Sequence, residues 1–314
     1  MHALGASEVI AALDFPSLVE GLRQMFRSGG CEMPQRHRHT IPVPGARDGE
    51  LLIMPAWQRG RHLGVKLLTV FPDNPAQKRP AMMGAYLLLD GRSGAPLALM
   101  DAPALTARRT AAASALAASY LARPDCERLL MIGTGALASH LIEAHASVRP
   151  IRNVLVWGRD PDKAQRLARR LDRRGLKVAA TDDLRGAVSG AHIICCATTA
   201  REPILRGHWL PLGVHIDLVG AFTPEMREAD DETMRRARIF VDTREAALNE
   251  AGDLIGAIAA DVMTAEDIAG DLFELTRGSR AGRRYHDQIT LFKSVGVALE
   301  DLAAAQLALE HILS

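Results

Sequence analysis

Hydrophobic and polar positions follow two different patterns along the chain. In the first hundred or so residues, short apolar runs at 50–55, 62–71 and 82–90 are separated by turns rich in proline, glycine and aspartate. Runs of this length between turn residues predict β-strands. Residues 106–122 are rich in alanine and contain neither proline nor glycine, which predicts a long helix that ends before Pro124.

From residue 128 onward, apolar strands alternate with amphipathic helices. A short apolar run at 129–132 is followed by one helical face, formed by Leu137, Leu141, Ala144 and Val148. Asp160 followed by Pro161 predicts the N-cap and first turn of a helix that reaches about residue 173. Other apolar runs predict strands at 154–157, 178–180, 191–197, 214–219 and 238–241. This alternation predicts an α/β fold with a Rossmann-type, doubly wound parallel sheet.

The C-terminal segment at 289–309 is apolar and rich in alanine and leucine, and we interpret it as helical. We expect a C-terminal helix at 290–314 to pack on the first domain. The predicted organisation is therefore an α+β domain at 1–117, completed by 290–314, and a Rossmann dinucleotide-binding domain at 118–289.

Composition and charge narrow the class of protein. Hydrophobic residues make up 48% of the 314 positions and charged residues 24%, an ordinary balance for a globular protein. The net charge of +1 comes from interspersed acids and bases, so no basic face for nucleic acid is expected. No apolar run approaches the roughly 20 residues that cross a bilayer, and residues 1–10 lack the basic leader of a signal peptide. We expect a cytoplasmic protein that neither spans a membrane nor binds nucleic acid.

The four cysteines do not predict a metal site. Cys31, Cys126, Cys195 and Cys196 form no CxxC motif and have no histidine at zinc-ligand spacing. Cys195 and Cys196 lie in the apolar run at 191–197, where we expect buried thiols in a reducing compartment.

A glycine-rich turn joins the run at 129–132 to the helix that follows. It has the form GxGxxA and consists of Gly133, Thr134, Gly135, Ala136, Leu137 and Ala138. Between a strand and a helix, this pattern is typical of dinucleotide binding. Gly133 permits the tight turn, Gly135 lets backbone N–H groups approach the pyrophosphate, and Ala138 lets the helix pack closely on the strand. The alternative is a tight turn without a ligand.

The residue after the predicted strand at 154–157 bears on the choice of nicotinamide cofactor. An acidic residue at this position would bind the ribose hydroxyls and repel a phosphate on the same sugar. Gly158 stands there instead, followed by Arg159. We therefore expect NADP(H) to be preferred, with Arg159 bound to its extra phosphate, and NAD(H) to be possible. The alternative is that Arg159 is a solvated loop residue.

Several short motifs together resemble the ornithine cyclodeaminase/mu-crystallin family. They are GVKL at 64–67, TARRTAAAS at 106–114, VGAFTP at 219–224 and FKSVG at 292–296, together with the glycine-rich turn. The resemblance covers nearly the whole chain. It implies a homodimer in which a substrate and dimerisation domain, here 1–117, is joined to the Rossmann domain. The family includes ornithine cyclodeaminases, alanine dehydrogenases, ketimine reductases and 1-pyrroline-2-carboxylate reductases.

The resemblance also implies site residues. Arg36, Lys66 and Arg109 fall where the family holds a substrate carboxylate, and guanidinium groups are suited to this because they bind a planar carboxylate with two hydrogen bonds. Burial and neighbouring cations should lower the pKa of Lys66 and make it a proton donor near neutral pH. Ser294 and Val295 match the family's substrate-side segment. Further contacts to the dinucleotide are expected from Thr110, Thr198, Val219 and Gly220.

One position departs from the ornithine cyclodeaminase pattern. Those enzymes carry an aspartate in a Gly-Gly-Asp-x-Pro-Gly-Lys segment, and its carboxylate acts as acid and base while ammonia is lost. Phe222 stands at that position here, and a positioned general base contributes roughly 10²–10⁴ in rate. Asp217, Glu225 and Glu228 lie at the wrong offsets, and we interpret them as loop charges or caps.

The resemblance and this departure predict an NAD(P)H-dependent reductase of a preformed cyclic imine. The expected substrate is 1-pyrroline-2-carboxylate or its six-membered homologue 1-piperideine-2-carboxylate, and the product is L-proline or L-pipecolate. Lys66 would keep the ring nitrogen protonated, and Phe222 would form an apolar wall beside the ring. The alternatives are an ornithine cyclodeaminase or alanine dehydrogenase of the same family, and a non-catalytic NADPH-binding protein of the crystallin type.

Overall fold

The computed structural model describes residues 1–313 and divides into two compact units. Unit 1 consists of Met1–Arg109 and Val297–Ser314, and unit 2 of Thr110–Gly296. The division expected from the sequence lay at 117/118 and 289/290. The two units meet at 109/110 and 296/297, and both the expected and the observed first boundary lie inside helix α3 (Ala102–Leu121), which corresponds to the long alanine-rich helix predicted at 106–122.

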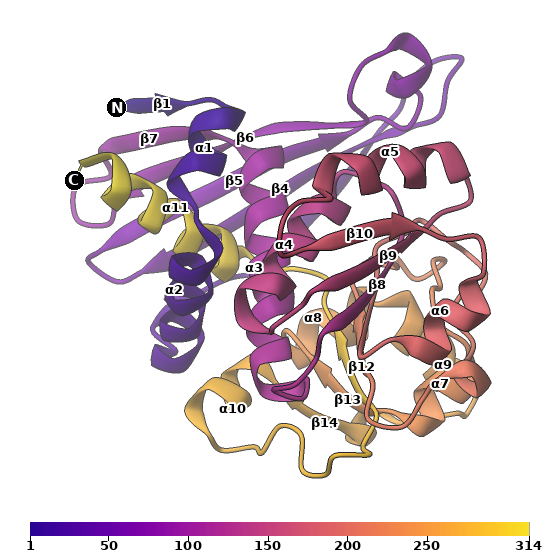
Figure 1. The fold of residues 1–314 in the computed structure, drawn as a ribbon. Helices are drawn as coiled ribbons and strands as arrows, with labels where there is room; N and C mark the ends of the chain where they lie inside the picture. Colours follow the sequence, from indigo (N-terminus) through magenta and orange to yellow (C-terminus); the bar gives the residue numbers. More distant parts are fainter. Residues whose placement is uncertain (314) are drawn as a thin grey trace. The chain divides into compact units, whose positions relative to one another are not determined.

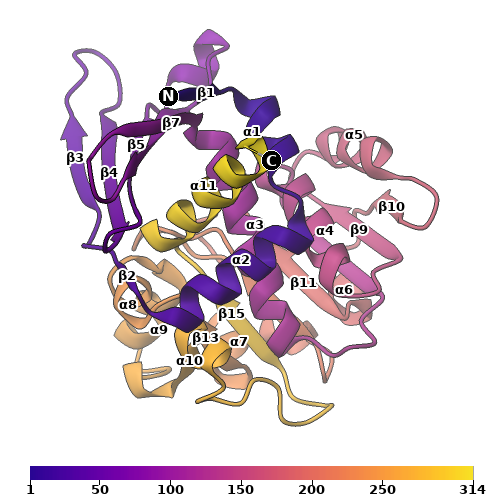
Figure 2. The same cartoon turned by 90° about the vertical axis from the view of Figure 1, so that its left-hand side faces the viewer.

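Unit 1 is built on a sheet that has seven strands among the described residues, in the order β1-β7-β6-β5-β4-β2, with β3 paired to β4 (Figure 1 and Figure 2). Strands β4, β5 and β6 correspond to the three predicted runs. The strand bounds are β1 His2–Leu4, β2 Cys31–Glu32, β3 His37–Ile41, β4 Gly49–Gln58, β5 His62–Val70, β6 Met82–Asp90 and β7 Pro96–Asp101. Helix α1 (Ala6–Ala12) packs on β7, while α11 (Ala298–Leu313) packs on β4, β5 and α2 (Phe15–Ser28) (Figure 2).

The two faces of this sheet differ in what they meet. Because side chains alternate along a strand, Lys66 lies on the face that packs on α11, together with the buried Leu68 and Tyr86. The opposite face is also apolar but stays partly open, with Leu67, Met83 and Leu99 exposed to 45%, 41% and 39%. The sheet therefore has one face in the core of unit 1 and one apolar face that is open in this chain.

Unit 2 contains a parallel sheet with eight strands among the described residues, in the order β10-β9-β8-β11-β12-β15-β13-β14. Its strands are β8 Arg128–Ile132, β9 Asn153–Trp157, β10 Lys177–Ala180, β11 Ile193–Cys196, β12 His215–Leu218, β13 Arg238–Val241, β14 Ile268–Asp271 and β15 Thr290–Lys293. The helices are α4 Leu137–Val148, α5 Pro161–Leu171, α6 Leu184–Gly190, α7 Asp231–Arg236, α8 Arg244–Glu250, α9 Gly252–Ala259 and α10 Leu272–Arg277. The predicted Rossmann-type α/β fold is confirmed.

Strand order reverses beside β8. The chain adds β9 and β10 on one side of β8 and then places β11 and β12 on the other. In open parallel sheets, ligands bind outside the carboxyl ends of the strands at such a reversal. The topology therefore predicts a ligand site at the turns that follow β8, β9 and β11.

The predicted continuous helix at 289–309 is wrong in its first part. Thr290–Lys293 forms strand β15, which is inserted between β12 and β13, and helix α11 begins only at Ala298. Gly296, with a φ of 77°, separates the two elements. The error has a physical cause, because a buried strand and a buried helix are both continuously apolar and their periodicity cannot tell them apart.

Within residues 1–313, no helix combines the length and apolar character needed to cross a bilayer.

Candidate functional site

The glycine-rich turn after β8 has the geometry that dinucleotide binding requires. Gly133 has a φ of +119°, and a Cβ there would lie 2.5 Å from the carbonyl oxygen of Ala197, so only glycine fits. A Cβ at Gly135 would meet nothing within 4 Å, which leaves open space beside the start of α4. Ala138, which is 1% exposed, lets α4 pack closely. A pyrophosphate could approach backbone N–H groups here.

A cavity of about 650 Å³ lies at this turn, where β8, β9 and β11 end. Several of the predicted cofactor residues line its wall, namely Gly133, Thr134, Gly135, Arg159 and Thr198. The other lining residues are Trp157, Gly158, Asp160, Lys163, Ala197, Thr199, Ala200, Arg201, Glu202 and Ile204. No sequence motif marks the loop at 199–202, which joins the site only once the strands are assembled.

Other predicted cofactor residues are not among those that line this cavity. Ala136 and Leu137 stand at the start of α4, and Thr110 is buried in α3. Val219 and Gly220 are at the end of β12, where Val219 N–H donates to the Cys196 carbonyl at 2.8 Å. A Cβ on Gly220 would lie 2.3 Å from the carbonyl oxygen of Thr198, so this glycine shapes the neighbouring loop.

The end of β9 lacks an acid for a structural reason. A Cβ on Gly158 would lie 2.7 Å from Cγ2 of Thr134, so a larger residue would displace Thr134 from the turn. Arg159 is exposed and faces the cavity together with Lys163. Asp160 caps α5 as predicted, since its Oδ1 accepts from the N–H of Lys163 at 3.1 Å.

Unit 1 holds a buried cluster of charged side chains. Lys66 Nζ lies 2.7 Å from Oδ2 of Asp301 and donates to Oδ1 of the same carboxylate at 2.9 Å. Arg109 Nε donates to Asp301 Oδ1 at 2.9 Å, and its Nη1 donates to Glu300 Oε2 at 2.6 Å. All four side chains are buried. The fold thus brings the predicted Lys66 and Arg109 together around Asp301.

The surroundings of Lys66 change its protonation. Burial lowers its pKa most, Arg109 and Arg36 lower it further, and Asp301 raises it, so that the pKa is about 7 instead of the ordinary 10.5. The ammonium and neutral amine forms are therefore both populated near neutral pH. Arg36, which is half-buried before β3, belongs electrostatically to the same cluster.

The charges of these five side chains do not cancel. When Lys66 is protonated, the cations Arg36, Lys66 and Arg109 exceed the carboxylates Glu300 and Asp301 by one. A single small carboxylate would restore neutrality, because an arginine has more N–H donors than Arg109 uses here.

Glu300 and Asp301 were not predicted from the sequence. A signal for them existed, because two adjacent acids within a strongly apolar helix require buried partners.

Ser294 and Val295, the predicted substrate-side residues, are in unit 2. Ser294 is buried after β15, and its N–H donates to the Leu218 carbonyl at 3.2 Å. The N–H groups of Val295 and Gly296 both donate to Oδ2 of the buried Asp242, at 2.8 and 2.7 Å. Asp242 therefore fixes the backbone of this segment.

Two of the three carboxylates interpreted as loop charges are in fact buried. Asp217 is buried on β12, and Glu228 is 1% exposed and bonded to Thr198 in the cavity wall. Glu225 is exposed, as expected. Phe222, at the position of the cyclodeaminase aspartate, is 38% exposed. The sequence interpretation failed for Asp217 and Glu228 because their bonding partners are distant along the chain.

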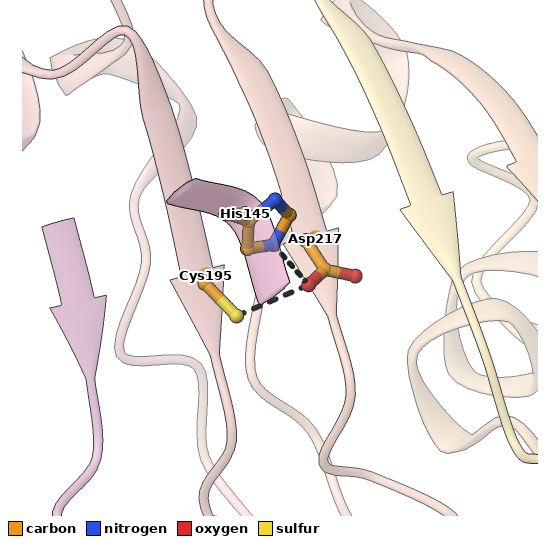
Figure 3. A group of neighbouring side chains, drawn as sticks. All are labelled: His145, Cys195 and Asp217. Atoms are coloured by element: carbon orange, nitrogen blue, oxygen red, sulfur yellow. Dashed lines mark hydrogen bonds and ion pairs between the residues drawn. The ribbon is translucent and has the colours of Figure 1, made fainter. Parts of the chain in front are cut away.

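Asp217 is the centre of a buried hydrogen-bond network (Figure 3). Its carboxylate bonds Ser114 Oγ at 3.0 Å, His145 Nε2 at 3.0 Å and Cys195 Sγ at 3.1 Å. Sequence spacing predicted no metal site, yet His145, Cys195 and Asp217 are of metal-ligating type and their ligand atoms lie within 4.8 Å of one another. Burial, followed by the charge of Asp217, raises the pKa of the Cys195 thiol well above its usual range, so the thiol stays protonated and donates. The network ties α3, α4 and β11 to β12.

The strand order, the glycine-rich turn and the cavity at the strand ends define a dinucleotide-binding protein of the Rossmann type. Comparison with known proteins agrees. The model of the ornithine cyclodeaminase/mu-crystallin family matches residues 5–314. A Delta(1)-pyrroline-2-carboxylate reductase of Paracoccus denitrificans is 43% identical over 96% of this chain and 94% of its own length.

Two solved structures are also similar. The Thermococcus litoralis Delta(1)-pyrroline-2-carboxylate reductase in complex with NADH and L-proline has a TM-score of 0.93 at 35% identity, covering 100% of this chain and 98% of its own. An archaeal alanine dehydrogenase dimer with bound NAD has a TM-score of 0.91 at 29% identity, covering 100% and 96%. The chain belongs to the ornithine cyclodeaminase/mu-crystallin family.

Replacing Asp301 tests the buried cluster. We expect Asp301→Asn to lower the free energy of unfolding by about 3 kcal/mol or more, because it leaves buried cations without their carboxylate. The pKa of Lys66 should fall further below 7, since Asp301 is the group that raises it. Urea unfolding measures the first effect.

Asp73→Asn, at an exposed pair with Arg47, is the control and should leave stability nearly unchanged. Equal stability of Asp301→Asn and the parent chain would contradict the role assigned to this carboxylate.

Proposed function

We propose that the chain is an NAD(P)H-dependent reductase of cyclic ketimines. It reduces 1-pyrroline-2-carboxylate, 1-piperideine-2-carboxylate or both, giving L-proline or L-pipecolate. The observation that carries the proposal is the buried pair of Lys66 and Arg109 on Asp301, with the pKa of Lys66 at about 7. The reductase names of similar proteins support the same reaction.

The carboxylate of the imino acid is bound by Arg109 and Arg36. Its single negative charge offsets the excess positive charge of the cluster in unit 1. Asp301 and Glu300 hold the Arg109 guanidinium in one orientation, so little side-chain freedom is lost when the substrate binds. Ser294 and Val295, whose segment is fixed by Asp242, are the proposed further substrate contacts.

Lys66 supplies the proton. Its ammonium form donates to the ring nitrogen, directly or through water, because an iminium carbon accepts hydride more readily than a neutral imine. Asp301 keeps the amine from losing its proton too easily. A reduced nicotinamide, when bound, supplies the hydride to the carbon between the nitrogen and the carboxylate.

Phe222 separates this reaction from cyclodeamination. It offers no carboxylate to act as acid and base in the loss of ammonia, and we propose that its ring is an apolar wall for the substrate.

The dinucleotide is bound by unit 2, with NADP(H) preferred over NAD(H). The proposed contacts are Thr110, Gly133, Thr134, Gly135, Ala136, Leu137, Arg159, Thr198, Val219 and Gly220. The preference rests on Gly158, which contributes no acid, and on Arg159 at the cavity wall. A guanidinium there can pair with a phosphate on the adenosine ribose.

The chain is further proposed to form a homodimer through the open face of the sheet in unit 1. Leu67, Met83 and Leu99 lie on that face and are partly exposed, and a second copy would remove them from water. The similar alanine dehydrogenase is a dimer.

The reductase proposal predicts a defined pH dependence. With 1-pyrroline-2-carboxylate and NADPH, kcat/KM should fall as the pH rises through about 7, because the ammonium form of Lys66 is lost there. Lys66→Ala should reduce kcat by roughly 10²–10⁴. Lys66→Arg keeps the positive charge but does not release a proton near neutral pH, so it should also be nearly inactive. NADPH oxidation, followed by its absorbance, is the assay.

Full activity of Lys66→Ala would refute the proton-donor role. Strong turnover of ornithine to proline and ammonia, or of alanine with NAD, would replace the reductase proposal with one of the family alternatives. Dinucleotide binding without turnover of any cyclic ketimine would favour the crystallin-type alternative.

The cofactor preference is tested at Arg159. Arg159→Ala should raise the KM for NADPH about tenfold, because an exposed charge-assisted contact is lost, while the KM for NADH stays within about twofold. Arg166→Ala, at an exposed arginine on helix α5, which follows Arg159, is the matched control and should change neither value. A wild-type chain that prefers NADH would contradict the preference itself.

The dimer is tested by mass. Leu67→Glu should convert a dimer of the 34.0 kDa chain to a monomer, because a charge on the open sheet face cannot be buried against a second copy. Light scattering gives the mass directly. Leu212→Glu, at a leucine that is 67% exposed in unit 2, should leave the dimer intact. A monomeric wild-type chain would exclude the proposal.

A further inference from the structure

The loop after β11 forms one wall of the dinucleotide cavity. Thr198, Thr199, Ala200, Arg201 and Glu202 all line it. The loop has no regular secondary structure, so its conformation depends on what lies behind it. That support is the segment at 227–229. Arg227 N–H donates to the Ala200 carbonyl at 2.8 Å, and Ile204 N–H donates to the Glu228 carbonyl at 2.9 Å.

The side chain of Glu228 makes the closest connection to this loop. Its Oε1 accepts from the N–H of Thr198 at 2.7 Å and from the Thr198 hydroxyl at 2.8 Å. The same hydroxyl accepts from the N–H of Ala200 at 3.3 Å. One carboxylate oxygen thus fixes both the backbone and the hydroxyl direction of the first loop residue. Because the same hydroxyl accepts from Ala200, Glu228 also helps to fix the backbone at Ala200.

Glu228 is itself held rigidly from behind. Asp253 Oδ1 accepts from the N–H of Glu228 at 2.7 Å and from that of Ala229 at 3.0 Å. Lys293 Nζ lies 3.4 Å from Asp253 Oδ2 and also donates to the carbonyl of Gly220. A Cβ on Gly220 would lie 2.5 Å from Cδ of Glu228, so a glycine is required for this packing. These contacts leave the Glu228 carboxylate little freedom to move.

Placing a carboxylate here is costly. Glu228 is 1% exposed, and its Oε2 has no hydrogen-bond partner within the described chain. Burial raises its pKa to about 7, while Lys293 opposes the shift. An apolar side chain would fill this space at lower cost but could not hold the two donors of Thr198.

We propose that Glu228 is a positioning residue for the dinucleotide, acting through Thr198 to hold the cavity wall in its binding conformation. This rests on the proposed function, because it assumes that the cavity binds a nicotinamide dinucleotide. Glu228 is not proposed to replace the aspartate that is absent at Phe222, because its Oε1 is bonded to Thr198 and its Oε2 is buried.

The test measures NADPH binding without turnover. Trp157 lines the cavity, so energy transfer from tryptophan to the reduced nicotinamide reports the dissociation constant. Glu228→Ala should raise that constant about tenfold, whereas Glu228→Gln keeps an acceptor oxygen and should stay within about threefold. Thr198→Val removes the hydroxyl bond but keeps the backbone N–H bond to Glu228, so it should weaken binding in the same direction but by less than Glu228→Ala. The double variant should bind no more weakly than Glu228→Ala, because that change already removes both bonds to Thr198.

Asp217→Asn is the matched control. Asp217 is an equally buried carboxylate of unit 2 that bonds three side chains, and its replacement should lower the unfolding temperature without changing the dissociation constant. A merely structural role for Glu228 would make the two variants behave alike. If Glu228→Ala does not fold, Thr198→Val and Glu228→Gln are compared with Asp217→Asn in its place.

Unchanged NADPH binding in Glu228→Ala or Thr198→Val, or an equal loss in Asp217→Asn, would overturn the proposal. A wild-type chain that binds no nicotinamide dinucleotide would overturn it together with the proposed function. Weakened binding in the Glu228 and Thr198 variants of a chain that reduces no ketimine would support the positioning role and refute only the proposed reaction.

Discussion

The ion pairs that Asp301 forms with Lys66 and Arg109 hold the buried charged cluster of unit 1 together. Three elements meet at this carboxylate: strand β5, helix α3 and helix α11. Removing these charges from water is expensive, and the cost is offset only while all three stay together. The same contacts hold the pKa of Lys66 at about 7, so its protonated and neutral forms coexist near neutral pH. The stability of the cluster and the protonation of Lys66 therefore both depend on Asp301, which α11 supplies.

Unit 2 uses buried carboxylates differently. Its buried carboxylates bond mainly hydroxyl, thiol, imidazole and backbone N–H groups instead of cations; they are Asp217, Asp242, Asp253 and Glu228. Their main effect is therefore to fix the positions of neighbouring backbone segments. Several of their partners lie in the turns and loops that follow β11, β12 and β15. Such turns have few hydrogen bonds of their own, and a buried acceptor supplies the missing partner. A sheet whose carboxyl ends form a ligand cavity benefits from acceptors placed in this way.

Membership in the family does not by itself decide the reaction, because the family contains lyases and oxidoreductases. The proposed distinction rests on one side chain after β12. Phe222 offers no carboxylate at the position of the cyclodeaminase aspartate, whereas Lys66, Arg109, Glu300 and Asp301 form a buried charged cluster in unit 1. Under the proposed function, this cluster binds the carboxylate of a small acid and donates a proton to it. Reduction of an existing C=N bond needs no more than these and a hydride donor.

Much of this protein could be predicted from short segments. The glycine-rich turn, the cap at Asp160, the alanine-rich helix and the alternating strands are local features, because propensity, periodicity and turn chemistry act over a few residues. The short motifs at 64–67 and 106–114, which carry the family resemblance, also singled out Lys66 and Arg109 as candidate site residues.

Tertiary structure decided the rest. It separated β15 from α11, where apolar character alone was ambiguous, and it showed that Asp217 and Glu228 are buried. It also supplied Asp301, which lies 235 residues from its partner Lys66. Such pairings follow from the assembly of distant strands and helices, and no local pattern records them.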